Sequence, residues 1–158
     1  MSCRFPARLV DCMLAIMLAM LTMLAMLQQA SAAERAVLLV TSNDCQMETI
    51  SALDIRKAYF GIGVSYEGHA VRALRLKGDE KLNQIFFQSV VAMSEKTYER
   101  RLLLQLLKYG QPRPREFESV GDLVTAVNEV PCSIAYMWQH EINEHTGIKV
   151  IKVLWQEN

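Results

Sequence analysis

The chain has 158 residues, of which 51% are hydrophobic, and its 17 basic and 17 acidic residues leave no formal net charge at pH 7. This length suits one domain with at most a short appendage. The neutral balance lacks the basic footprint of nucleic-acid binding, so we expect no nucleic acid as a partner.

The start of the chain has the pattern of an export signal. Arg4 and Arg8 give a basic beginning, residues 13–27 form an uncharged apolar run, and small alanine and serine residues follow. That order predicts a secretory signal peptide over residues 1–32, one domain over residues 33–158, and a periplasmic or secreted location. A retained membrane anchor is the alternative, but the run is shorter than the roughly 20 residues that a span needs.

The first half of the remaining chain alternates strand and helix patterns. Residues 35–43 form a continuous apolar run that predicts a buried strand. Residues 51–61 begin with a serine, have an aspartate three positions later and end at a glycine, which predicts a capped helix. The glycine-rich stretch 61–69 predicts a loop, and the alternating stretch 70–76 predicts a second strand.

The second half continues this alternation. Helices are predicted over 78–91, 94–110 and 119–131, a proline-containing connection over 111–118, and strands over 132–138 and 147–155. The last strand alternates isoleucine and valine with lysine, so we expect it at a sheet edge with its lysines solvated. Strands that alternate with helices predict an α/β fold with parallel strand pairs.

A polar site is predicted where three strands end, because ligands bind outside the carboxyl ends of parallel strands. The residues expected there are Thr41, Ser42 and Asn43, then Arg75, Lys77, Gly78 and Asp79, and finally Tyr136, Met137 and Trp138. Of these, Ser42, Asn43, Arg75, Lys77, Gly78, Asp79 and Tyr136 are the predicted ligand-binding residues. The alternative is that they are ordinary loop ends.

No enzyme motif stands out. There is no nucleophile elbow, zinc-type histidine spacing or phosphate-binding loop, so we expect no catalysis and no cofactor. His140 and His145 lie near two glutamates, but a solvated polar loop explains them better than a metal site does.

The stretch from Leu53 to Val91 resembles the phosphate-type substrate-binding proteins of ABC transporters. Leu53, Ile55, Tyr59, Phe60 and Gly61 match that family's signature at the end of a helix, and "LLKYGQPRP" and "VNEVPCSIAYM" match two later segments. The likeness spans roughly residues 36–154. It implies a single-lobe, periplasmic-binding-protein type II-like three-layer sandwich, with a mixed, mostly parallel sheet, helices on both faces and a small anion or solute as ligand.

The sequence departs from this family at the anion loop. The family pattern is Arg-x-x-Gly-Ser-Gly-Thr, whereas this chain has Arg75 and Gly78 followed by Asp79, Glu80 and Lys81. We expect the carboxylate of Asp79 to cap the next helix itself, in the place where relatives bind phosphate. This hypothesis predicts weak phosphate binding or none.

Two cysteines, Cys45 and Cys132, remain after the signal segment, and in an exported protein such a pair suggests a disulfide. In the family-like sheet, however, the strand before Cys45 and the strand after Cys132 run parallel as neighbours. The two cysteines would then lie about 16 Å apart, at opposite ends of five strand residues. We therefore expect no bridge, although the compartment argues for one.

Two functions remain open. The first is a non-catalytic periplasmic solute-binding or accessory module, presenting a ligand to a membrane transporter or sensor. The alternative is a protein-interaction module that docks on such a membrane protein without binding a small molecule. An open cleft where Ser42, Arg75 and Tyr136 converge would favour the first, and a filled cleft with an exposed apolar patch elsewhere would favour the second.

Overall fold

The computed structural model describes residues 35–157, so the predicted signal segment, residues 1–32, lies outside the described residues. The elements in chain order are β1 (Ala36–Ser42), α2 (Ala52–Tyr59), β2 (Ser65–Tyr66), β3 (His69–Ala70), β4 (Arg72–Leu76), α3 (Glu80–Ile85), a π-helical turn η1 (Phe86–Val90), α4 (Glu95–Tyr109), β5 (Arg115–Phe117), α5 (Val120–Glu129), β6 (Ser133–Trp138), α6 (Gln139–Ile142) and β7 (Ile148–Gln156).

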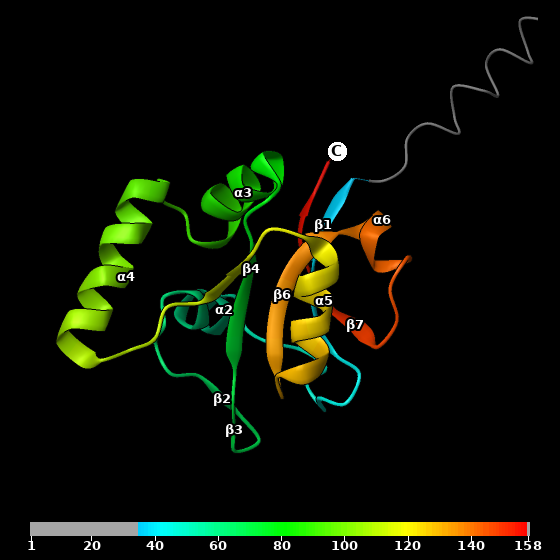
Figure 1. The fold of residues 1–158 in the computed structure, drawn as a ribbon, viewed down its shortest axis with the longest axis horizontal. Coiled ribbons are helices and arrows are strands. Elements are labelled where there is room, and N and C mark those ends of the chain that lie inside the picture. Colours follow the sequence, from blue (N-terminus) through cyan, green and yellow to red (C-terminus); the bar gives the residue numbers. More distant parts are fainter. Residues whose placement is uncertain (1–34, 158) are drawn as a thin grey trace, which may run out of the picture. The chain divides into compact units, whose positions relative to one another are not determined.

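A five-stranded sheet in the order β5-β4-β6-β1-β7 forms the centre of this unit (Figure 1). β4 pairs in parallel with both β5 and β6, while β1 pairs antiparallel with both β6 and β7. Four strands therefore run in one direction and β1 alone opposes them. The mixed, mostly parallel sheet predicted from the sequence is confirmed, and β7 lies at an edge as expected.

Helices cover both faces of the sheet. Successive side chains of β6 point to opposite faces, so their contacts show which helices lie on each side. Tyr136 packs against Tyr59 at the end of α2 and Phe86 in η1. On the other face, the hydroxyl of Ser133 donates to the carbonyl oxygen of Val127 in α5. This is the predicted three-layer arrangement.

The predicted helix starts are confirmed by their caps. Ser51, Ser94 and Ser119 each accept a hydrogen bond from the backbone N–H three residues later, at the starts of α2, α4 and α5. Gly110 ends α4 in the left-handed conformation, with φ of 63°.

Three predicted segments differ in detail. The expected helix over 78–91 is the short helix α3 continued by the π-helical turn η1. The connection 111–118 contains β5, and the loop 61–69 contains most of the small hairpin β2–β3. The strands β2, β3 and β5 are too short to show a hydrophobic period in the sequence. β5 forms because its backbone pairs with β4.

The direction of β1 corrects the sequence prediction. β1 and β6 are neighbours as expected, but they are antiparallel, with Val37 opposite Trp138 and Val40 opposite Ala135. The rule that a strand, helix and strand give a parallel pair applies to strands that become neighbours. β1 and the next long strand, β4, are separated in the sheet by β6, so the rule does not fix the direction of β1.

The prediction that Cys45 and Cys132 are unbridged is wrong for the same reason. Because β1 and β6 are antiparallel, the end of β1 lies beside the start of β6, as the 2.7 Å bond from the hydroxyl of Thr41 to the carbonyl of Ser133 shows. The Cα atoms of Cys45 and Cys132 are 5.1 Å apart, and the two residues form a disulfide.

Among residues 35–157, none of the helices has the length and apolar character that crossing a bilayer requires.

Replacing both Cys45 and Cys132 with serine should lower the free energy of unfolding by about 4 kcal/mol, because the bridge closes a loop between residues 87 positions apart. Urea unfolding of the oxidised protein and of the double variant measures this difference. A loss below about 1 kcal/mol would contradict the expectation.

Candidate functional site

The reversed direction of β1 separates the predicted site residues into two groups. Ser42 ends β1 and Asn43 follows it. Both lie beside the start of β7, where the N–H of Asn43 donates to the carbonyl oxygen of Gly147 at 2.8 Å. Ser42 lines a hollow of about 210 Å³ next to the disulfide. Lys77, Gly78 and Asp79 follow β4 at the opposite end of the sheet, so the structure does not bring the two groups together.

The turn after β4 is closely packed. The N–H of Lys77 donates to the carbonyl oxygen of Phe117 at 2.7 Å, and a Cβ atom at Gly78 would collide with the carbonyl oxygen of Glu118. The side-chain amide of Asn83 donates to the carbonyl oxygens of Lys77 and Asp79 at 2.8 and 2.9 Å. Gly78 is therefore required for the close approach of two loops, and Asn83 fixes the turn.

The carboxylate of Asp79 occupies the start of α3, as predicted. Its Oδ1 accepts the N–H of Leu82 at 2.8 Å, which makes Asp79 the N-cap of α3. Its Oδ2 accepts the indole N–H of Trp138 at 2.7 Å. Both carboxylate oxygens are thus bonded within the protein, and one of them ties α3 to the end of β6.

Trp138 is held from a second side by Glu141. The carboxylate of Glu141 accepts the backbone N–H of Trp138 at 3.0 Å, and burial raises the pKa of this carboxyl group. The amine of Lys81 lies 5.9 Å from the centre of the indole ring. An open hollow outside this cluster is lined by Gly78, Asp79, Glu80, Lys81 and Gln84, so two carboxylates face the space where an anion would approach.

Arg75 is buried, with 1% of its surface exposed, and it does not line this hollow. Its guanidinium carbon lies 5.0 Å from the ring centres of Phe86 and Tyr98 and 5.3 Å from that of Phe87. Its Nη1 donates to Glu116 at 2.8 Å and lies 3.5 Å from a carboxylate oxygen of Glu99.

Two further cations complete this cluster. Lys77 lies 3.6 Å from Glu116, and Arg113 lies 2.8 Å from Glu99. The sequence analysis did not place either glutamate at the site, because Glu99 lies inside the predicted helix 94–110 and Glu116 inside the predicted connection 111–118. Only the sheet pairing of β5 with β4 brings Glu116 beside Arg75.

Tyr136 is fully buried and stacks on Phe86 with ring centres 4.8 Å apart. Its hydroxyl donates to the carbonyl oxygen of Leu76 at 3.4 Å, and burial raises its pKa to about 12. Tyr136 is thus a neutral core residue, and it does not line the hollow beside the disulfide or the one outside α3.

Within residues 35–157 no cluster of three or more histidine, cysteine, aspartate or glutamate side chains has the geometry to hold a metal ion. At the end of β4, Asp79 and Arg75 are both engaged by groups of the protein itself, and this arrangement holds the adjoining loops together.

Comparison with known proteins gives a likeness in fold. No protein-family profile matches the chain, and no curated protein is similar to it in sequence. The crystal structure of PstS from Borrelia burgdorferi aligns with a TM-score of 0.55 at 14% identity, covering 76% of this chain and 47% of that protein. A possible phosphate binding protein from Planctomyces limnophilus DSM 3776 aligns with a TM-score of 0.52 at 14% identity, covering 76% of this chain and 42% of that protein.

At this level of identity the likeness establishes the fold, which agrees with the family that the sequence resembles. The chain spans less than half the length of either of these structures.

Changing Arg75 to lysine should lower the free energy of unfolding by about 2 kcal/mol, because an ammonium group cannot stack on the three rings while it reaches both carboxylates. Arg115 on the neighbouring strand is exposed and is the matched control, with an expected change below about 0.5 kcal/mol on mutation to lysine. Equal effects of the two substitutions in urea unfolding would contradict the structural role of Arg75.

Proposed function

We propose that the protein is an exported, non-catalytic binding module in which the helix-end anion site of a phosphate-binding-type fold is closed by its own carboxylate. It acts as an accessory component and does not capture free phosphate at the start of α3. The bidentate engagement of Asp79, with Leu82 on one oxygen and Trp138 on the other, is the observation that carries this proposal.

Electrostatics support it. A helix start attracts anions because its free N–H groups and the helix dipole are positive, and Asp79 already uses that potential. A second anion 4 Å from this carboxylate would meet a repulsion of about 4 kcal/mol at an effective dielectric constant of 20, before screening by salt. Glu80, in the first turn of α3, adds to the repulsion.

The arginine that the family resemblance assigns to the anion is also engaged elsewhere. Arg75 is buried among three aromatic rings and paired with Glu116 and Glu99, so its charge is already compensated. A phosphate ion would have to displace these carboxylates to reach it.

Export is supported by two independent features. The basic, apolar and small-residue order of residues 1–32 is the pattern of a signal peptide. The disulfide between Cys45 and Cys132 suits an oxidising compartment such as the periplasm.

Titration calorimetry with inorganic phosphate tests the proposal. The protein without residues 1–32 should give no saturable heat below about 1 mM phosphate, because Asp79 and Glu80 repel the ion. The double variant Asp79→Ser with Glu80→Gly keeps a capping hydroxyl, removes both charges and should bind phosphate at least about tenfold more tightly.

The matched control is Ser94→Ala with Glu95→Gln, which alters the cap and first-turn charge of α4 and should leave phosphate binding unchanged. A micromolar dissociation constant for the unsubstituted protein would overturn the closed-site proposal.

A second candidate function is docking on an acidic protein partner, such as the periplasmic domain of a membrane transporter or sensor. The last two turns of α4 expose a set of large apolar side chains, here called the α4 leucine face: Leu103, Leu104, Leu106, Leu107 and Tyr109. α4 forms one side of the described unit in Figure 1. An exposed apolar patch of this kind marks an interaction surface more often than a bare solvent face.

The charge of α4 indicates the character of the partner. The helix carries Lys96, Arg100, Arg101 and Lys108 against Glu95 and Glu99. Glu99 is already paired with Arg75 and Arg113, so the surface offered by α4 is basic as well as apolar. An acidic rim around an apolar groove would complement it.

A photo-reactive amino acid at Leu107 should crosslink one protein in the cells that naturally produce this chain, and Arg100→Glu with Lys108→Glu should abolish the product. Val153 on the edge strand β7 is also exposed and is the control position. Crosslinking to a second copy of the chain, or equal capture of the same partner from position 153, would contradict docking through α4.

A further inference from the structure

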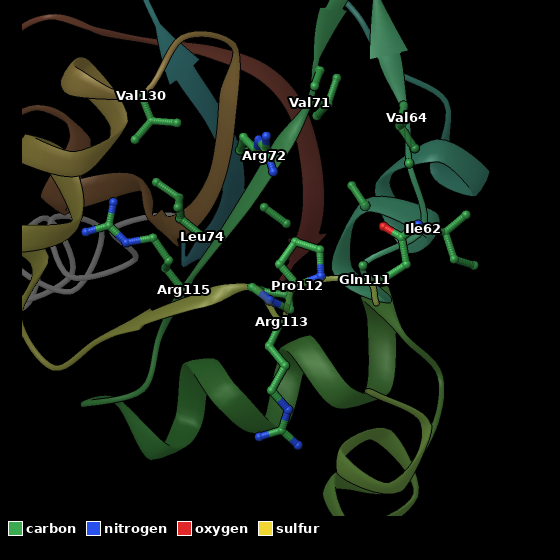
Figure 2. Close-up of a pocket in the computed structure, with 16 residues that line it drawn as sticks. Ile62, Val64, Val71, Arg72, Leu74, Gln111, Pro112, Arg113, Arg115 and Val130 are labelled. Carbon is green, nitrogen blue, oxygen red and sulfur yellow. The ribbon is translucent and has the colours of Figure 1, made fainter. Parts of the chain in front are cut away.

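A partly open hollow of the described unit lies at the start of β4, away from the turn that follows this strand. It has a volume of about 460 Å³ and lies between the start of β4, the segment that leads into β5 and the loop after α2 (Figure 2). Its lining residues do not include Asp79, Trp138 or Glu141. The hollow is called the β4–β5 cavity below, and its volume is that of a pocket for a small organic ligand.

The cavity exists because β5 is short. β5 pairs with β4 only at Leu74–Leu76, so the beginning of β4 is not covered by this neighbour. The preceding segment contains Pro112 and Pro114, which lack the N–H that a longer strand would need. At Gly61 a Cβ atom would come within 2.8 Å of the carbonyl oxygen of Pro112, so the loop after α2 closely approaches this segment and forms a wall.

The lining is apolar with a cationic side. Ile62 and Val64 lie on one side of the cavity, and Leu74 and Val130 lie on the other, near Arg72 and Arg115 (Figure 2). None of the residues that line the cavity is an aspartate or a glutamate.

The arginines at the cavity differ in their pairing. Arg113 points away from the hollow in Figure 2 and is bonded to Glu99 at 2.8 Å. Within residues 35–157, neither Arg72 nor Arg115 has an ion-pair partner. Arg115 instead lies over the ring of Phe117 at 5.2 Å.

Arg72 and Arg115 lie on neighbouring strands and on the same face of the sheet. Leu74 is directly opposite Arg115, and Arg72 is two residues before Leu74, so the two arginines form a diagonal pair. Strand spacing and rise place their Cα atoms about 8 Å apart. Two long guanidinium side chains at this separation can reach one carboxylate together.

We propose that the β4–β5 cavity binds an anionic amphiphile, namely a small molecule with an apolar body and a carboxylate-type head. The head pairs with Arg72 and Arg115, and the apolar body lies against Ile62, Val64 and Leu74. The contrast with Arg75 on the same strand supports this assignment, since Arg75 has two carboxylates of the protein beside it whereas the cavity has none.

This inference does not depend on the closed anion site, because the two sites share no lining residue. A failure of the cavity proposal, seen as no ligand binding in the β4–β5 cavity, can therefore be distinguished from a failure of the closed-site proposal, seen as phosphate binding at the start of α3.

The probe is octanoate. Octan-1-ol serves as a neutral ligand of the same chain length, and acetate serves as a carboxylate without the long alkyl chain. Calorimetry on the protein without residues 1–32 should show saturable 1:1 binding of octanoate in the submillimolar range, and at least about tenfold weaker binding of the other two. Absence of saturable octanoate binding up to about 5 mM would overturn the proposal.

Charge and volume are tested by separate variants. Arg72→Gln with Arg115→Gln should weaken octanoate binding at least about tenfold, whereas Arg113→Gln should leave it unchanged because this side chain is directed to Glu99. Gly63→Leu should block binding, since Gly63 lines the cavity and has free space for a side chain. Gly121→Leu is the control for the volume test, because Gly121 has equal free space but lies outside the cavity.

Thermal unfolding of each variant confirms that the fold is retained. Equal affinity for octanoate and octan-1-ol, or undiminished octanoate binding in either the double arginine variant or Gly63→Leu, would overturn the assignment.

Discussion

The carboxylate of Asp79 connects the turn after β4 with the start of α3 and the end of β6. One oxygen caps α3, the other accepts the indole N–H of Trp138, and the turn before it passes so close to Glu118 that only Gly78 fits. Free N–H groups at a helix start attract anions, and here the carboxylate of Asp79 accepts one of these N–H groups, that of Leu82. Here the protein satisfies the helix start from within.

The arginines of β4 and β5 lie close together in the sheet but differ in their surroundings: one is paired in the core and two lie beside a cavity. Arg75 points into the layer of η1 and α4, where aromatic rings surround it and two glutamates neutralise it. Arg72 and Arg115 point to the other face, beside a cavity without acidic residues. Because neighbouring positions along a strand alternate between faces, a shift of three residues moves an arginine from the core to a cavity that can take a ligand.

Much of the fold follows from local patterns. Continuous apolar runs predicted the buried strands β1 and β6. Serine residues predicted the starts of α2, α4 and α5. The position of Asp79 before an apolar helical stripe predicted that it caps α3. Each of these depends on residues within about four positions of one another. The predicted site residues do not converge, since Ser42 and Asn43 lie at the far end of the sheet from Lys77 and Gly78.

The sequence alone determined the α/β class, the helix starts and the capping role of Asp79, because backbone N–H groups and apolar stripes act over a few residues. The tertiary structure decided the direction of β1, the bridge between Cys45 and Cys132, and the pairing of Arg75 with Glu116. These depend on which strands become neighbours, and that order is set by packing of the whole sheet, in which β6 lies between β1 and β4.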